Sequence, residues 1–281
     1  MVYFGHGTDN ALDESAWLVS HAAGLPVDFA DEELERPLTP QQQQAVVSLL
    51  RQRVEKRLPL SYLIHEAWFA GHRFYVDERV LVPRSPIAEL IGAQFRPWIR
   101  ADKVQRVLDL CTGSGCIAIA TALAMPEVEV DAADVSAEAL EVARINVKQY
   151  GLEERVRLIR SDLFSGLAGK QYDLIVSNPP YVDAGEMAAL PEEYRAEPAL
   201  GLAAGEDGLA LVLPMLQQAA EYLNPEGVLF VEVGNSAEAL ARLFPAVPFT
   251  WLEFAAGGEG VFMLSAEQLQ DCREYFSGTN K

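Results

Sequence analysis

The chain of 281 residues has few basic residues for its acidic content. It holds 22 Lys and Arg against 41 Asp and Glu, which gives a formal net charge of -19. A field of that sign repels phosphate backbones, so it disfavours an enzyme that acts on duplex nucleic acid and favours a basic protein partner. Half of the residues are hydrophobic, which is typical of a globular chain with a buried core and not of a disordered one.

Cysteines and histidines are also scarce. The three cysteines, Cys111, Cys116 and Cys272, show no paired spacing, which disfavours a disulfide scaffold and predicts a reducing, cytoplasmic location. The four histidines lack the spacing of metal ligands, so we expect no metal. The longest apolar stretch, residues 116–125, is too short to cross a bilayer, and residues 1–10 do not resemble a signal peptide.

Residues 1–65 are predicted to form a small helical domain. Apolar residues recur at helical spacing within residues 13–23 and again after Thr39 and Pro40, a pair typical of a helix start. Aromatic and β-branched residues over 66–85 then predict short strands or a hairpin, which we interpret as the linker between two domains.

Residues 86–281 alternate between strand and helix patterns. Strands are expected at 106–110, 127–134, 155–161, 172–178, 228–233, 250–254 and 261–264. Helices are expected at 87–98, 116–125, 137–150, 209–223 and 237–244. Such alternation predicts an α/β fold with a doubly wound, mostly parallel sheet.

A glycine-containing loop, Asp109-Leu110-Cys111-Thr112-Gly113-Ser114-Gly115, follows the first strand of this series. Gly113 and Gly115 allow a tight turn and a close approach to a ligand, and the amides at the next helix start favour electron-rich groups. Because open α/β sheets bind ligands at the carboxyl ends of their strands, we expect a cofactor here. The residues expected to contact it are Asp109, Cys111, Thr112, Gly113, Ser114 and Gly115. An ordinary strand-to-helix turn would also explain the two glycines.

Two acidic residues end the next strands. Asp134 can accept hydrogen bonds from both hydroxyls of a ribose, or it can cap the helix that begins at Ala137. Asp162 can meet the amino group of an adenine while Leu163 covers the ring, or it can cap a turn. The glycines, with Asp134 about twenty residues further on, also satisfy a dinucleotide fingerprint. These residues alone therefore do not separate a nicotinamide cofactor from S-adenosylmethionine.

The tetrapeptide Asn178-Pro179-Pro180-Tyr181, at the carboxyl end of the fourth strand, separates the two cofactors. An amide nitrogen is a poor nucleophile, because its lone pair is delocalised into the carbonyl. The side-chain oxygen of Asn178 and the carbonyl of Pro179 can each accept one amide hydrogen, which stabilises the charge that develops on the nitrogen. The prolines stiffen the backbone, and Tyr181 can pack on a planar substrate group. The tetrapeptide predicts methyl transfer to an amide-like nitrogen, which a dehydrogenase would leave unexplained.

With this tetrapeptide after the glycine loop, the chain resembles the glutamine-amide protein methyltransferases over nearly its whole length. The resemblance implies a seven-stranded methyltransferase domain over 86–281, which follows the helical domain in the chain. We assign substrate recognition to the helical domain, residues 1–65. The resemblance implies S-adenosylmethionine as cofactor, held by the glycine loop and Asp134. It also implies that Asn178 and Pro179 hold the glutamine amide.

The segment before the catalytic domain indicates a branch of this family. Enzymes that modify peptide-release factors usually carry Pro-Arg-Pro-x-Thr-Glu there, whereas this chain has Pro83-Arg84-Ser85-Pro86-Ile87-Ala88-Glu89. Residues 190–198, 232–236 and 249–254 are likewise similar to the branch that modifies a large-subunit ribosomal protein (protein three). The resemblance therefore implies a glutamine of that protein as substrate, with the release-factor branch as the alternative.

Two rival functions and two residues stay open. An adenine-amino DNA methyltransferase uses the same tetrapeptide, but it flips its base and needs a basic channel. A non-enzymatic assembly factor would bind a ribosomal protein through the helical domain. Arg84 can neutralise a carboxylate of the cofactor or of Glu197, or it is a plain surface charge, and Glu197 can face the cleft or simply precede a turn.

Overall fold

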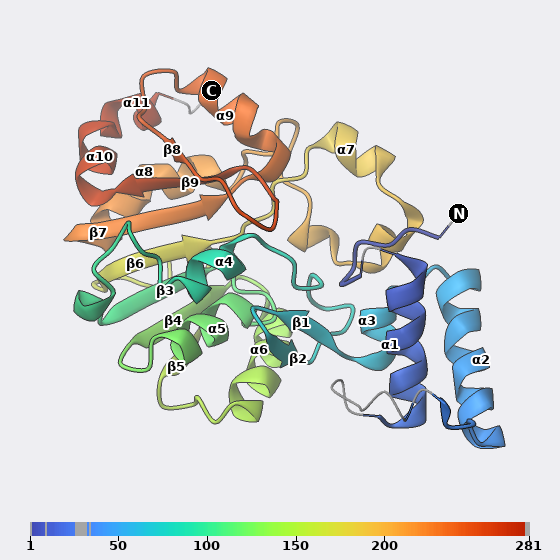
Figure 1. Cartoon of the computed structure of the whole chain (residues 1–281). Helices are drawn as coiled ribbons and strands as arrows, with labels where there is room; N and C mark the ends of the chain where they lie inside the picture. The colour runs from blue at the N-terminus through green and yellow to red at the C-terminus, as the bar shows by residue number, and fades with distance from the viewer. Residues whose placement is uncertain (1, 9, 26–32, 34, 279–281) are drawn as a thin grey trace.

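The computed structural model describes residues 2–8, 10–25, 33 and 35–278, and it places a helical N-terminal part beside a larger α/β part (Figure 1). Residues 1, 9, 26–32, 34 and 279–281 lie outside the described residues, although they belong to the predicted segments 1–65 and 86–281. Within the described part, no helix is long and apolar enough to cross a membrane.

The N-terminal part contains α1 (Ala11–Ala23), α2 (Pro40–Glu55) and α3 (Leu60–Ile64). The side chain of Asn10 caps α1 by accepting hydrogen bonds from two backbone amides. A reciprocal capping box between Thr39 and Gln42 begins α2, which confirms the predicted helix start. The five-residue α3 was not predicted, because so short a helix shows no periodicity.

A hairpin of β1 (Ala67–Phe69) and β2 (His72–Phe74) follows, with Ala70 and Gly71 in its turn at positive φ. The expected segment 66–85 therefore contains a hairpin, but its β-branched run at residues 79–82 forms no strand. Val80 and Val82 are buried without a partner strand, so their β-branched side chains reflect burial and not pairing.

The α/β part is built on one seven-stranded sheet of order β5-β4-β3-β6-β7-β9-β8. Its strands are β3 (Arg106–Leu110), β4 (Glu129–Asp134), β5 (Val156–Arg160), β6 (Tyr172–Ser177), β7 (Leu223–Glu232), β8 (Thr250–Trp251) and β9 (Val261–Ser265). The first five strands in this order pair in parallel, and β9 pairs antiparallel with both β7 and β8. The predicted doubly wound, mostly parallel sheet is confirmed. The strand order reverses direction between β3 and β6, which is where such sheets bind ligands.

Helices cover both faces of this sheet (Figure 1). They are α4 (Ile87–Gly92), α5 (Cys116–Ala124), α6 (Ala137–Gln149), α7 (Ala184–Ala189), α8 (Val212–Tyr222), α9 (Ala237–Leu243), α10 (Ala266–Asp271) and α11 (Arg273–Ser277). Side chains alternate along β6: Leu174 and Val176 join the core under α4 and α5, whereas Ile175 joins the core under α8 and α10. Strands buried on both faces explain the continuous apolar runs in the sequence.

Several boundaries differ from the prediction. Helix α4 ends at Gly92 and not near residue 98, and β7 begins at Leu223, directly after α8. Helices α7, α10 and α11 were not predicted, and neither was the short 3-10 helix η3 (Glu192–Ala196). Each of these helices has at most six residues, too few to show a clear apolar period.

Candidate active site

The glycine loop lies between β3 and α5, at the point where the strand order reverses. Gly113 and Gly115 have φ of +55° and +80°, the left-handed region that glycine adopts without a steric penalty. A Cβ on Gly113 would meet nothing within 4 Å, whereas a Cβ on Gly115 would lie 3.2 Å from that of Ala143 in α6. The loop therefore presents Gly113 to open space and uses Gly115 for close packing.

Asp109 lies buried beneath this loop. One of its carboxylate oxygens accepts hydrogen bonds from the Thr112 hydroxyl and, at 3.0 Å, from the backbone amide of Ala118 at the start of α5. Its other oxygen is buried and has no hydrogen-bond donor among the described residues, and burial raises the pKa of the carboxyl to about 7. Such an unsatisfied acceptor in a ligand loop is suited to a donor supplied by a bound molecule.

Asp134 ends β4 beside the loop. Its two carboxylate oxygens accept hydrogen bonds from the backbone amides of Gly113 and Ser136, both at 2.9 Å. The cap of α6 is provided by the Ser136 side chain, so Asp134 is not its N-cap. Burial raises the pKa of Asp134, and each of its oxygens keeps a lone pair that can accept a ribose hydroxyl.

The third expected cofactor contact follows β5. Asp162 is exposed, and its backbone carbonyl accepts a turn hydrogen bond from Ser165. Leu163 is half-buried at φ +45°. The adjacent Phe164 is fully buried and stacks on Tyr222 at 4.5 Å, so this aromatic ring belongs to the core.

The tetrapeptide continues directly from β6. The Ser177 hydroxyl at the end of β6 donates to the backbone carbonyl of Leu110 at 2.6 Å, which joins the tetrapeptide to the glycine loop. Within the described part of the chain, neither the Asn178 side chain nor the Pro179 carbonyl has a hydrogen-bond partner. Both residues line a cleft of about 370 Å³, within the roughly 300–1,000 Å³ usual for small-molecule sites. The two residues that carry these acceptors therefore line one cleft.

Tyr181 also lines the cleft, and its hydroxyl donates to Glu232 at the end of β7, at 2.9 Å. Burial raises the pKa of this phenol, so it stays protonated and acts as a donor. Pro180 is buried behind the cleft. Glu232 was not predicted as a site residue, because the segment 232–236 was notable in the sequence only for its resemblance to the ribosomal-protein branch.

Arg84 and Glu197, both uncertain from the sequence, form a bidentate ion pair with distances of 2.8 and 2.6 Å. The guanidinium lies 5.0 Å from the centre of the Tyr194 ring, another residue of the cleft. Burial alone would raise the pKa of Glu197, but Arg84 and the nearby imidazole of His6 hold it at about 2. Arg84 thus pairs with a protein carboxylate that also accepts the backbone amide of Val82.

A second buried ionic cluster ties the cleft to the N-terminal helices. Arg53 of α2 contacts Glu14 of α1 at 2.6 Å and Glu193 of η3 at 3.2 Å. Glu193 also accepts the backbone amide of Tyr3 at 2.8 Å. Because the next residue, Tyr194, lines the cleft, this cluster fixes one side of the cleft against residues of the helical part.

Comparison with known proteins assigns the family. The family model of the methyltransferase small domain matches residues 95–192. A ribosomal protein uL3 glutamine methyltransferase of Neisseria meningitidis serogroup B is 52% identical over 269 residues, which cover 95% of this chain and 88% of that protein. The chain belongs to this methyltransferase family. The family member from Neisseria gonorrhoeae is also 52% identical, over 95% of this chain and 90% of its own length.

Solved structures agree with the fold of the family. A methyltransferase from Pyrococcus furiosus superposes with a TM-score of 0.50 at 16% identity, over 82% of this chain and 99% of its own. The catalytic domain of hMettl16, solved with an RNA hairpin, gives a TM-score of 0.52 at 17% identity, over 80% of each chain. The predicted methyltransferase and its branch are confirmed by the family, and the dehydrogenase alternative is wrong.

Proposed function

We propose that this chain transfers a methyl group from S-adenosylmethionine to the side-chain amide nitrogen of a glutamine in ribosomal protein uL3. The observation that carries the proposal is the pair of unpaired acceptors, Asn178 and Pro179, in a cleft joined to a glycine loop. The names of the relatives at 52% identity support uL3 as the substrate. A ribosomal substrate also favours a cytoplasmic location.

The cofactor site that we propose lies at the carboxyl ends of four adjacent strands, β5, β4, β3 and β6. Gly113 leaves room for a ligand, Asp109 offers a buried oxygen without a donor, and Asp134 keeps acceptor capacity for a ribose. The proposed contacts are Asp109, Cys111, Thr112, Gly113, Ser114, Gly115, Asp134, Asp162, Leu163 and Asn178. When bound, S-adenosylmethionine supplies an electrophilic methyl group at this end of the sheet.

The chemistry that these residues add is positioning and charge stabilisation. Asn178 and Pro179 each accept one hydrogen of the glutamine amide, which fixes the nitrogen and stabilises the positive charge that develops on it. Orientation of this kind lowers a barrier by up to roughly 7–11 kcal/mol. Tyr181 and Pro180 hold this part of the cleft. Among the described residues that line it, none is a histidine, cysteine or lysine, and the proton that the methylated nitrogen loses can pass to water.

Methyl transfer to competing acceptors tests the proposal. The purified chain, labelled S-adenosylmethionine, uL3 and a peptide-release factor are combined, and the labelled residue is identified by mass spectrometry. We expect label on a glutamine of uL3. Label on the release factor would move the substrate to the other branch, and absence of label on both, with the cofactor bound, would contradict the proposed acceptor.

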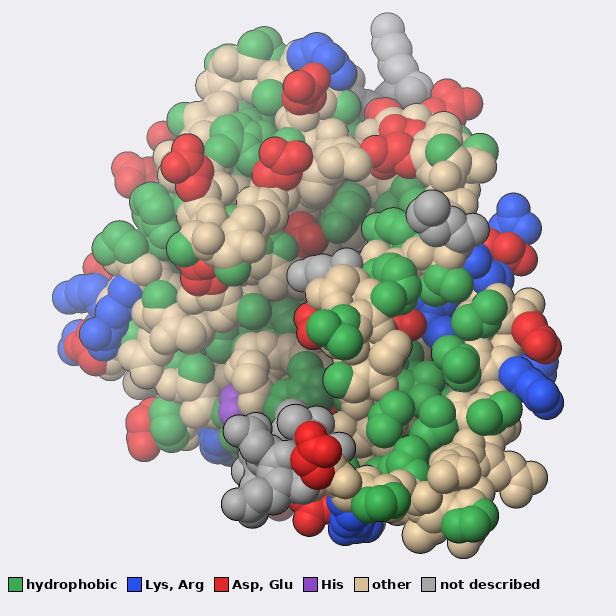
Figure 2. Space-filling view, turned by 45° about the vertical axis from the view of Figure 1, so that its right-hand side comes forward, with side chains coloured by type: hydrophobic (Ala, Val, Ile, Leu, Met, Phe, Trp, Pro, Cys, Tyr) green, Lys and Arg blue, Asp and Glu red, His purple; other side chains and the backbone are tan. Residues whose placement is uncertain are grey.

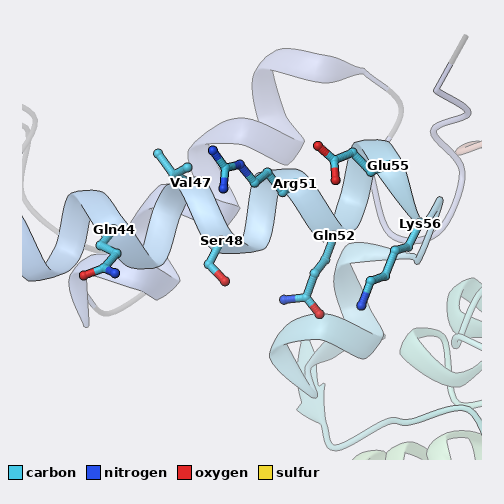
Figure 3. Close-up of a pocket in the computed structure, with 7 residues that line it drawn as sticks. All are labelled: Gln44, Val47, Ser48, Arg51, Gln52, Glu55 and Lys56. Carbon is cyan, nitrogen blue, oxygen red and sulfur yellow. The ribbon is translucent and has the colours of Figure 1, made fainter.

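The helical part presents a surface that suits a protein substrate. Val47, Leu50 and Val54 recur at helical spacing on α2 and are 47%, 48% and 47% exposed. Figure 2 shows exposed hydrophobic side chains over this part of the molecule. Figure 3 shows a hollow that includes Val47, whose described lining residues belong to α2 and its C-cap Lys56. The cleft that contains Asn178 is instead lined by several elements. We propose this helix face as a docking surface for uL3 and residues 1–65 as the recognition domain.

Replacing Val47, Leu50 and Val54 together by glutamine is expected to raise KM for uL3 about tenfold or more, the effect of losing one or more interface anchors. Cofactor affinity, measured by calorimetry, is expected to stay unchanged, because the glycine loop is untouched. Leu243→Gln, at a 43% exposed position of α9, is the matched control. An unchanged KM for uL3 in the triple variant would rule out this docking surface.

A further inference from the structure

Glu232 is a buried carboxylate for which the proposed methyl transfer has no role. It is the last residue of β7 and is 4% exposed. One of its oxygens accepts a hydrogen bond from the Tyr181 hydroxyl at 2.9 Å, and the other accepts one from the Ser85 hydroxyl at 2.5 Å. This carboxylate therefore joins the tetrapeptide, the sheet and the segment that precedes α4.

The backbone around Glu232 also confines the Tyr181 ring. Gly234 has φ +46°, and a Cβ at this position would lie 2.5 Å from Cε2 of the ring. The Ser236 hydroxyl donates to the backbone carbonyl of Tyr181 at 2.9 Å. The ring thus packs on bare backbone along one side, while its hydroxyl is fixed by Glu232.

The fit between Glu232 and its two donors depends on the charge of the carboxyl group. An ionised carboxylate is acceptor-only, so each oxygen satisfies one hydroxyl. A protonated carboxyl carries its own O–H, so the protonated oxygen becomes a donor and a weaker acceptor. The hydroxyl of Tyr181 or Ser85 that donates to this oxygen is then held less tightly or must reorient. We propose that ionised Glu232 is a positioning residue, which holds Tyr181 in place for the glutamine side chain, and that its protonation releases this hold. The proposal rests on the proposed function.

The environment brings this ionisation close to neutral pH. Burial raises the pKa of Glu232 to about 7, although hydrogen bonds from Ser85 and Tyr181 and the charge of Arg84 act to lower it. The neighbouring strand β9 pairs Val261 with Glu232 and adds no charge there. Since a raised pKa means that the carboxylate forms only above about 7, we expect kcat/KM for uL3 to fall as pH falls through that value.

Glu232→Gln tests the role, because the amide has one acceptor oxygen and one donor group, like the protonated acid. We expect the variant to lose the acid limb of the pH profile. At every pH its activity should stay near the level that the unaltered chain shows at low pH. At high pH this is about tenfold below the unaltered chain, the effect expected from losing one hydrogen bond to a charged group.

Ser85→Ala is the second variant, and it tests the role of Glu232 even if Glu232→Gln does not fold. It removes a hydrogen bond that lowers the pKa of Glu232, so the midpoint of the limb should move to higher pH while the high-pH activity is retained. A merely structural role would change the level of activity and leave the midpoint where it is. Infrared titration without ligand should show a carboxylic-acid band that is absent from Glu232→Gln. The titration midpoint of this band should move to higher pH in Ser85→Ala, as the midpoint of the activity profile does.

Asp109, whose pKa is also near 7, is distinguished by its place in the glycine loop. If the acid limb arose from Asp109, cofactor affinity would fall over the same pH range as activity, and the limb would persist in Glu232→Gln. If the unaltered chain methylates uL3 but the acid limb of its pH profile is unchanged in Glu232→Gln or in Ser85→Ala, the inference is contradicted and the proposed function still stands. Absence of transfer by the unaltered chain at every pH contradicts the proposed function, and with it the inference.

Discussion

The Asn178→Ala variant is expected to lose about 10²–10³-fold in kcat, the effect of removing one preorganised group that stabilises developing charge. The side-chain oxygen of Asn178 has no partner within the described structure, so it is free to accept an amide hydrogen of the substrate. Since the side chain makes no hydrogen bond to the described residues, the free energy of unfolding should change little. Single-turnover methyl transfer to uL3 measures the effect on chemistry.

A conservative variant separates the two halves of the Asn178 amide. Asn178→Asp keeps an acceptor oxygen and loses the donor, so it should retain more activity than Asn178→Ala if acceptance is the required role. Because Asn178 is also a proposed cofactor contact, cofactor affinity is measured on each variant, and single-turnover rates are compared with the cofactor saturating. Equal activity of Asn178→Ala and the unaltered chain would remove Asn178 from the mechanism.

The Arg53→Met variant is expected to lower the free energy of unfolding by about 3–5 kcal/mol, as is usual when one partner of a buried ion pair is removed. The Arg53 side chain is only 2% exposed and contacts both Glu14 and Glu193. Its guanidinium also donates to the backbone carbonyl of Tyr3 at 2.5 Å. Methionine would fill part of the space but leave two carboxylates without this donor.

Urea unfolding of Arg53→Met and Arg51→Met measures the effect. Arg51 lies on the same helix but is exposed, so its replacement should change stability by no more than about 0.5 kcal/mol. Because Glu193 precedes Tyr194 in the cleft, Arg53→Met should also raise KM for uL3. Equal stability of the two variants would show that Glu14 and Glu193 find other partners.

The sheet and the tetrapeptide could be predicted because both have local signals. Strands buried on both faces, such as β3 and β6, appear as apolar runs, and helices between them show their own period. The glycine loop and the tetrapeptide follow two such strands directly. The sequence therefore placed both at one edge of the sheet, and the hydrogen bond from Ser177 to Leu110 joins them there.

The rest of the cleft could not be predicted, because its contacts join residues far apart in the chain. Arg53 and Glu193 are 140 positions apart, and Tyr181 and Glu232 are 51 apart. No periodicity connects such residues, so their carboxylates look like the many other acidic residues of this chain. Residues 79–82 show a related limit, since a β-branched pattern indicates burial but does not identify a partner strand.

The ionic cluster around Arg53 limits how this protein can be rebuilt for a new substrate. A graft that replaces only residues 1–65 would place a foreign helix against Glu193 and would disturb the side of the cleft that carries Tyr194. The exchangeable unit is therefore discontinuous: it consists of the helical segment together with residues 190–197. A chimera with a single junction after residue 65 would combine the recognition helices of one enzyme with the residue 190–197 side of the cleft from another.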